Sequence, residues 1–448
     1  MTGGWFNRRF RPAFTALMLC ALVPPLFGQT ETDDPEERVI HYFAPGGLDD
    51  PVARLQQRLA RGETTLRFEP RRGYLRSLLQ ELRVPVSSQG LVYSKTSSQA
   101  AQTSPRTPRA IYFTDDVYVG WVPDGPEIDL AAMDPKRGSI FYTLDQRREG
   151  PPTIVRRDDC LKCHLGPRTA NVPGLLVRSI LTAADGTPLS QIERFVSGHN
   201  SPLETRWGGW YVTGTHVGAQ HLGNILVTDP VHPEHVNPAE GANVTRLKDK
   251  FDTARYLSPH SDLVALMVLE HELRMQNLII RANYETLLAR DPQSGGGGTS
   301  GWPEQRIARA GETLLEYLLF RNEAPLKGPV KGSSKFAAEF QRGGPRARDG
   351  RSLRRLDLQT RMFRHPCSFL IYSRAFDGLP REMKNYLWRR LVEILSGEDQ
   401  SETYAGMEPR DRRAVLEILR ETKPEFAAAE RAGSRSRAAT DAPALNPP

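Results

Sequence analysis

The 448-residue sequence has few cysteines and no long apolar run. Its four cysteines, Cys20, Cys160, Cys163 and Cys367, are too few for the disulfide framework of a stapled scaffold. No second C-x-x-C pair accompanies Cys160 and Cys163, so the ligand set of a structural zinc site is incomplete. The apolar run near the N-terminus, residues 13–23, is too short to cross a membrane.

The N-terminus has the pattern of a secretory signal peptide. Three arginines within residues 8–11 precede the apolar run, and Gly28 marks the expected cleavage point. Removal of residues 1–28 takes Cys20 with it and lowers the formal net charge from +7 to +4. This mildly basic balance gives no indication of nucleic-acid binding. We expect an exported, soluble protein of a bacterial periplasm, with no transmembrane segment beyond the signal.

One short motif carries the clearest chemistry. Residues 160–164 read CLKCH, the C-x-x-C-H signature of covalent c-type haem attachment. The Cys160 and Cys163 thiols can add across the two vinyl groups of one haem. His164 then lies where its imidazole can bind the iron as the proximal ligand. Export supports this interpretation, because haem is attached covalently outside the cytoplasm. The sequence therefore predicts one covalently bound haem c.

Two other uses of the cysteine pair stay open, a zinc site and a disulfide. Zinc requires further ligands at short spacing, and none follows the motif. A thioredoxin-like redox pair follows a strand at the head of a helix in a βαβ unit. Here the pair lies in a charged stretch rich in glycine and proline, residues 156–173, which favours haem.

The identity of the distal iron ligand separates an electron carrier from a haem enzyme. No methionine occurs between His164 and Met267, which excludes a methionine ligand from the residues that directly follow the motif. Histidines are the remaining candidates. His271 lies on the apolar stripe of a helix expected over 262–288, and so it is either a satisfied core residue or the distal ligand.

Other polar side chains near the motif are candidates for the haem pocket. Residues 207–216, WGGWYVTGTH, set glycine beside aromatic residues, which suits either close approach to a flat cofactor or a turn that packs its own aromatics. Further distal-ligand candidates are His199, His216 and His221. Candidates to pair with the haem propionates, when they are not simply solvated, are Arg156, Arg157 and Arg168.

The periodicity of apolar residues indicates an α+β fold, with short strands in a mixed N-terminal part and a mostly helical C-terminal half. The haem-attachment loop lies in the middle of the chain. Helices are expected at 50–59, 74–82, 262–288, 303–320, 351–372, 380–395 and 410–419. Strands are expected at 39–43, 110–122, 128–133, 139–144 and 174–181, with 110–122 either one bent strand or a hairpin.

Composition and periodicity divide the chain into four regions. Residues 1–28 are the signal peptide, and 29–255 form a mixed α/β region that contains the haem motif. Residues 256–430 form a helical region. Residues 431–448 are rich in Ala, Arg, Ser and Pro and are expected to be a disordered tail.

Several segments together resemble a family of large exported cytochrome c-like proteins with a single haem, from soil and aquatic bacteria. The resemblance spans residues 108 to about 380 and rests on PRAIYFTDDVYVGWVPDGP, FYTLDQ, CLKCH with VPGLLVRS, SPLETRWGGWYVTGTH with HLGN, SDLVALMVLEH, and HPCSFLIYS. It implies covalent haem binding through Cys160, Cys163 and His164, with electron transfer as the role. It does not identify the distal ligand.

Three functions are compatible with these observations. The first is periplasmic electron transfer to and from a redox partner protein, with the iron cycling between ferric and ferrous. The second is a haem-dependent, peroxidase-like oxidoreductase, in which the distal side stays open and His216, His221 or His271 acts as an acid or base. The third is a haem-based sensor or docking subunit. We favour the first function, because the sequence contains no recognisable set of catalytic residues.

Overall fold

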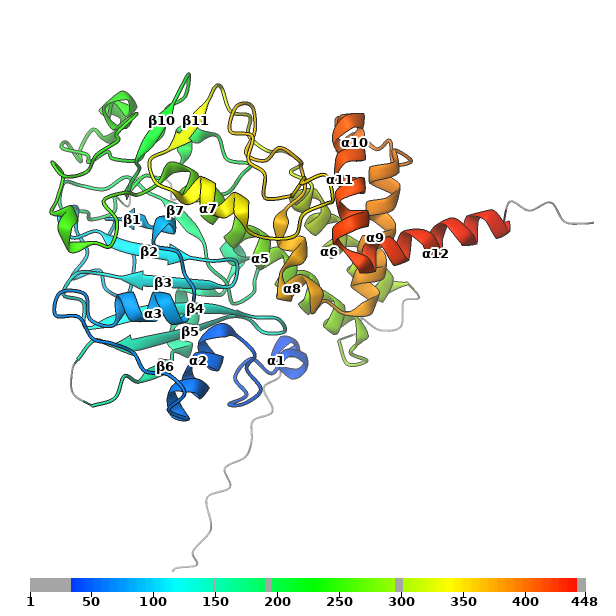
Figure 1. The fold of residues 1–448 in the computed structure, drawn as a ribbon, viewed down its shortest axis with the longest axis horizontal. Coiled ribbons are helices and arrows are strands. Elements are labelled where there is room, and N and C mark those ends of the chain that lie inside the picture. The colour runs from blue at the N-terminus through cyan, green and yellow to red at the C-terminus, as the bar shows by residue number, and fades with distance from the viewer. Residues whose placement is uncertain (1–33, 148–149, 190–194, 295–300, 441–448) are drawn as a thin grey trace, which may run out of the picture.

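The structure is a computed structural model that describes residues 34–147, 150–189, 195–294 and 301–440. The expected signal peptide, residues 1–28, lies outside the described residues. The architecture is α+β, with an antiparallel sheet in the N-terminal part and helices in the C-terminal half, as expected (Figure 1). Among the helices of these ranges, none has the length and apolar character that a membrane span requires.

The N-terminal part is built on a seven-stranded antiparallel sheet with the strand order β6-β5-β4-β3-β2-β1-β9. Residues 110–122 form a hairpin, not one bent strand, because Phe113 pairs with Tyr118 across a short turn. Its strands are β1 (Gly90–Val92), β2 (Arg109–Phe113), β3 (Val117–Trp121), β4 (Glu127–Asp134), β5 (Gly138–Asp145), β6 (Ile154–Arg156) and β9 (Trp210–Tyr211). Two small two-stranded sheets accompany it, β7 (Val177–Ser179) with β8 (Phe195–Ser197), and β10 (Gly214–His216) with β11 (Val330–Gly332).

Short helices precede the sheet in the sequence. They are α1 (Pro35–Ile40), α2 (Pro51–Ala60) and α3 (Leu75–Glu81). The strand expected over residues 39–43 is wrong, because α1 occupies its first two residues. Asp34 caps this helix by accepting from the backbone N–H of Glu36, and Pro35 starts it, a combination that favours a helical turn over an extended chain.

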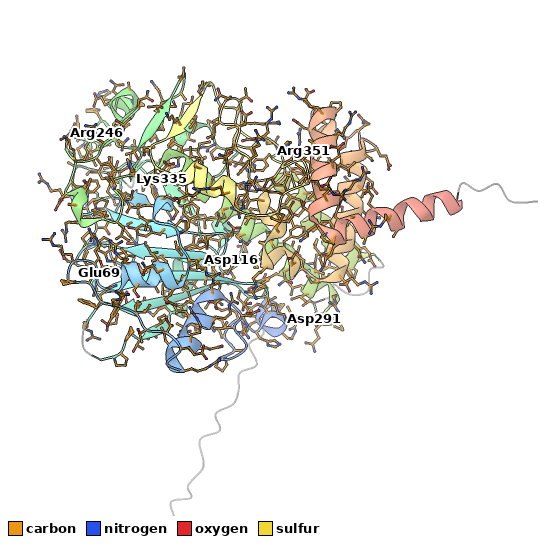
Figure 2. All side chains as sticks on the ribbon, viewed as in Figure 1. Glu69, Asp116, Arg246, Asp291, Lys335 and Arg351 are labelled. Atoms are coloured by element: carbon orange, nitrogen blue, oxygen red, sulfur yellow. The ribbon has the colours of Figure 1, made fainter. Side chains whose placement is uncertain are left out.

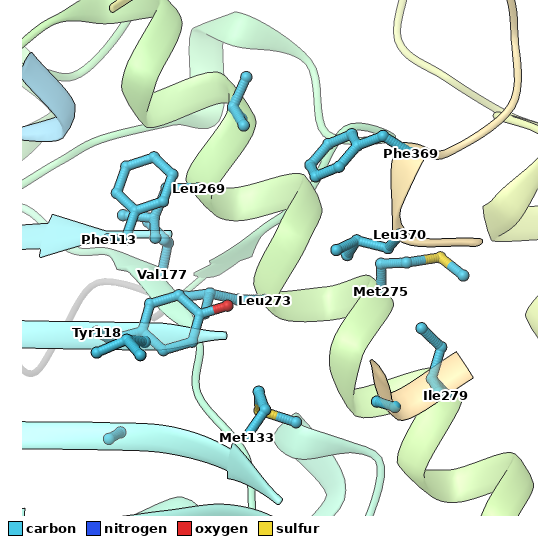
Figure 3. Close-up of a cluster of buried hydrophobic side chains, with 14 of the residues drawn as sticks. Phe113, Tyr118, Met133, Val177, Leu269, Leu273, Met275, Ile279, Phe369 and Leu370 are labelled. Atoms are coloured by element: carbon cyan, nitrogen blue, oxygen red, sulfur yellow. The ribbon is translucent and has the colours of Figure 1, made fainter. Parts of the chain in front are cut away.

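The long helix α5 (Leu263–Arg290) connects the two halves of the molecule. Asp262, the first residue of the expected helix, is instead its cap and accepts from Val264 N and Ala265 N. Most of its length is buried, because the sheet covers one side and the C-terminal helices cover the other (Figure 1). Figure 3 shows both contacts, with Tyr118 of the sheet beside Leu273 and Leu370 of the C-terminal half beside Met275.

The C-terminal half is helical around α5. Its helices are α6 (Trp302–Leu318), α7 (Phe336–Arg342), α8 (Arg374–Asp377), α9 (Arg381–Ser396), α10 (Glu402–Ala405), α11 (Pro409–Thr422) and α12 (Pro424–Thr440). The helices expected within 351–372 are wrong, because that stretch is irregular apart from a 3₁₀ turn at Phe369–Tyr372. The helix α12 runs into the stretch expected to be disordered from residue 431 (Figure 1). Its alanine- and arginine-rich sequence favours helix.

The mixed and helical regions share one hydrophobic core. A single cluster of buried side chains runs from Ile40 before the sheet to Phe426 in α12. Side chains fill the space between the two regions, and Asp116 lies where the sheet meets the helices (Figure 2). An ion pair between Asp115 and Arg354 joins the β2–β3 turn to the C-terminal half. The expected boundary near residue 255 is therefore a change of secondary structure within a continuous core.

Candidate haem site

The haem motif forms one tight turn at the end of the sheet. A 3₁₀ turn at Asp158–Cys160 follows β6 and Arg157, and it continues into the short helix α4 (Leu161–His164). Helical spacing brings the side chains of Cys160, Cys163 and His164 to one side, because residues three and four apart share a face. Cys160 is half-buried, Cys163 is exposed, and both are free thiols.

The imidazole of His164 is held in one orientation by the loop that follows it. Its Nδ1 lies 3.0 Å from the carbonyl oxygen of Gly174, and Gly174 N donates to the carbonyl of His164 at 2.9 Å. A carbonyl only accepts, so Nδ1 carries the proton and Nε2 keeps its lone pair. Burial lowers the pKa of His164 to about 4. The ring is therefore neutral near pH 7 and able to bind a metal through Nε2.

Beside these three residues lies a cavity of about 410 Å³, a size typical of cofactor pockets. One side of the cavity, its floor, is a face of the seven-stranded sheet, and the strand register determines which side chains form it. Ile111, Gly120, Asp129 and Thr143 stand opposite one another across β2, β3, β4 and β5, and all four line the cavity. Directly paired residues of neighbouring strands point to the same face. This floor spans three strand spacings, roughly 14 Å.

The walls of the cavity are largely apolar. Phe141 of β5 lies on the floor with its ring centroid 5.0 Å from that of His164. A further part of the lining comes from the chain around β7 and from Trp210 of β9. Tyr118, Val177, Leu269 and Leu273 close the end nearest α5, and they appear together in Figure 3. Flat apolar walls beside two thiols and an imidazole suit a porphyrin.

The thiol environment bears on the zinc alternative. Burial and the neighbouring Asp159 carboxylate raise the pKa of Cys160 to about 11. Cys160 is therefore a neutral thiol near pH 7, whereas zinc binds thiolates. Within the described ranges, no group of three or more His, Cys, Asp or Glu side chains is arranged to hold a metal ion. The residues present fit a covalently attached haem, which brings its own iron.

The distal-ligand candidates lie in two pairs away from the cavity. His199 and His271 are buried in the core, with their Nδ1 atoms 2.8 Å apart, and Nε2 of His271 lies 2.8 Å from Ser368 Oγ. His216 and His221 contact each other at 5.1 Å between ring centroids. Among the described residues that line the cavity, His164 is the only histidine, and no methionine is present. Iron ligation by any of the four stays a prediction.

Burial keeps these histidines neutral. It lowers the pKa of His271 to about 3 and that of His221 to about 4, and it holds the pKa of His199 well below its ordinary value. His199 also stacks on Tyr317 at 3.8 Å between ring centroids. His271 has a partner on each ring nitrogen, as a satisfied core residue does, which is the plainer of its two interpretations, whereas Nε2 of His199 and both ring nitrogens of His216 are buried without a hydrogen-bond partner.

The three arginines beside the motif have different surroundings. Arg157 lines the cavity and donates to both carboxylate oxygens of Asp159, each at 2.9 Å. Arg156 instead donates to the carbonyl of Tyr42 at 2.7 Å, and Arg168 is exposed and does not line the cavity. Two arginines that the sequence analysis missed, Arg109 and Arg178, also line the cavity. Strand alternation groups Arg109 with Ile111, but it does not say which face of the sheet carries a pocket.

The glycine-rich segment 207–216 contacts other backbone more than the cavity. A Cβ at Gly208 would lie 2.9–3.1 Å from backbone atoms of Ile180, and Gly209 has a φ of +80°. The glycines therefore let two stretches of chain pack closely. Trp210 is the residue of this segment that lines the cavity.

No family model, curated protein or solved structure matches the chain. The resemblance to exported single-haem cytochromes therefore stays a prediction from the quoted segments.

Proposed function

We propose that the protein is an exported c-type cytochrome that carries one covalently bound haem and acts in electron transfer. One observation carries the proposal. The C-x-x-C-H side chains line a preformed apolar cavity, and the lone pair on His164 Nε2 is left available by the hydrogen bond of Nδ1 to Gly174. Cys160 and Cys163 would hold the haem through thioethers, and His164 would bind its iron. Bound haem supplies one-electron chemistry by cycling between ferric and ferrous.

The exposure of the motif supports exchange of electrons with a partner protein. Cys163 is exposed, and Leu165, directly after the iron-binding imidazole, is 44% exposed. On the edge strand β6, Val155 pairs with the cavity-lining Thr143 and is 51% exposed. The edge of the haem that is linked to the cysteines would lie beside these exposed apolar side chains. Such a surface suits brief contact with a redox partner protein, which would dock in the periplasm.

A haem-dependent oxidoreductase is the second candidate. The lining of the cavity favours it in one respect. Among the described lining residues, His164 is the only histidine and there is no methionine, so a second protein ligand for the iron is missing. An iron with one protein ligand keeps a position open for a small molecule. A carrier would instead need a second ligand from a residue that does not line the cavity in this structure.

The experiment that tests the proposal is an optical spectrum in both oxidation states, recorded on protein produced with a haem-attachment system, beside a denaturing gel stained for haem. A stained band with a low-spin spectrum in both states supports the carrier. A stained band with a high-spin spectrum that shifts on adding peroxide or small ligands supports the oxidoreductase. An unstained band contradicts both and returns the cysteine pair to zinc or a disulfide.

A further inference from the structure

One end of the cavity is polar, in contrast to its apolar walls. It is formed by the loop that joins β1 to β2 and by the first residue of β2. The loop supplies four hydroxyl side chains to the lining, and Arg109 supplies a guanidinium. The four hydroxyl residues are Ser94, Thr96, Ser97 and Ser98.

Two hydrogen-bond donors at this end are buried without a partner. They are the Oγ of Ser97 and the Nε of Arg109. A buried donor that makes no hydrogen bond lowers stability, so such groups are rarely left alone in a folded protein. Both residues line the same cavity. Their arrangement fits a bound group with oxygen acceptors.

The guanidinium of Arg109 is fixed in place by its neighbours. It lies over Gly120 of β3, where a Cβ would collide with it. Its Nη2 donates to the Asp129 carboxylate at 2.7 Å, and Gln99 Nε2 donates to the same oxygen at 2.8 Å. Asp129 therefore already has its donors, and the Nε of Arg109 stays available to a ligand. A guanidinium with a free N–H matches a carboxylate well.

We propose that this polar end binds the propionate carboxylates of the haem, with Arg109 Nε and Ser97 Oγ as donors. The inference rests on the proposed function, because it needs haem in the cavity. It also assigns the two ends of the pocket. The thioethers form at the end with Cys160 and Cys163, and the carboxylates are held at the polar end, where the guanidinium of Arg109 lies over β3.

The propionate bending band of the resonance Raman spectrum tests the inference, since this band responds to hydrogen bonds on the haem carboxylates. The holoprotein and the variants Arg109→Gln, Arg109→Lys and Ser97→Ala are compared, with Arg168→Gln as the matched control outside the cavity. We expect the band to shift in Arg109→Gln and Ser97→Ala and to stay in place in Arg168→Gln. Arg109→Lys keeps the charge and should give the smaller shift of the two arginine variants.

Each result has a definite meaning. Ser97→Ala guards against a folding failure in Arg109→Gln, which leaves Asp129 without its ion pair. A band that is unchanged in both variants overturns the inference, because it would show that Arg109 and Ser97 make no hydrogen bond to the haem propionates. Absence of covalent haem from the wild type, seen on the stained gel, overturns the proposed function and the inference together.

Discussion

The ring Nδ1 of His164 lies 3.0 Å from the carbonyl oxygen of Gly174, ten residues further along the chain. The nine residues between them form a closed loop in which Thr169 is buried and its Oγ1 donates to the carbonyl of Val172 at 2.8 Å. The orientation of the proposed iron ligand is therefore set before any haem binds. Such a hydrogen bond also raises the basicity of a metal-binding imidazole.

A substitution at Gly174 tests this support. A Cβ there would collide with the amide of Asn277 on α5, so Gly174→Ala should displace the carbonyl that holds His164. We expect a loss of about 1–3 kcal/mol in unfolding free energy and a changed haem spectrum. The double variant Gly174→Ala/Asn277→Ala removes the collision and should recover much of both, at the cost of the Asn277 hydrogen bond to Leu175 O. Equal spectra for the wild type and the single variant would contradict the positioning role.

Substitution of His271 separates a core role from iron ligation. His271 is fully buried and bonded to His199 and Ser368. We expect His271→Ala to leave the haem spectrum unchanged and to lower the unfolding free energy by about 2–4 kcal/mol, through a cavity and lost hydrogen bonds. Loss of a low-spin spectrum in this variant would identify His271 as the distal ligand, against its position in the structure.

The pH dependence of stability can be tested at Glu323. Burial raises the pKa of this carboxyl to about 7, and the nearby Asp357 carboxylate raises it further. The hydrogen bond from Met362 N and the charges of Arg361 and Arg206 lower the pKa, but they only partly offset the effect of burial. The folded state therefore binds the proton more tightly than the unfolded state, whose pKa is about 4.5. Glu323 favours folding fully below the unfolded value, and this contribution is lost as the pH rises toward 7.

A neutral replacement should remove that dependence. We expect Glu323→Gln to match the wild type at pH 4.5 and to be more stable by about 1–3 kcal/mol at pH 8, in denaturant unfolding at both values. Gln can still accept from Met362 N. Exposed Glu304 gives the control, since Glu304→Gln should change little at either pH. A stability difference that is the same at both pH values would contradict the prediction.

Features of the site that depend on local sequence could be predicted. The C-x-x-C-H spacing makes Cys160, Cys163 and His164 the candidate haem-binding residues, because that chemistry needs neighbours along one turn of chain. The extended character of residues 110–122 and helix α5 were also predictable, because strong periodicity reflects which side chains face the core, although the choice between one bent strand and a hairpin stayed open. The short helix α1 was missed because the cap at Asp34 outweighs the strand propensity of Val39 and Ile40.

Features that depend on tertiary contact could not be predicted. Arg109 and Ser97 line the same cavity as the motif only after the sheet folds, because at least fifty residues separate each of them from Cys160. The pairing of His199 with His271 is likewise long-range, and helical periodicity shows only that His271 is buried. The sequence therefore predicts the attachment chemistry and not the opposite end of the cavity.

The central claim is that Cys160 and Cys163 hold one haem covalently. The most direct measurement is a haem-stained denaturing gel, with intact mass, of the wild type, Cys160→Ala/Cys163→Ala and Cys367→Ala, all produced with a haem-attachment system. Buried Cys367 lies outside the motif and provides the matched control. We predict a stained band and the mass of one added haem for the wild type and Cys367→Ala, and neither for the double variant. Haem that stays on the denatured double variant, or is missing from the wild type, would contradict the claim.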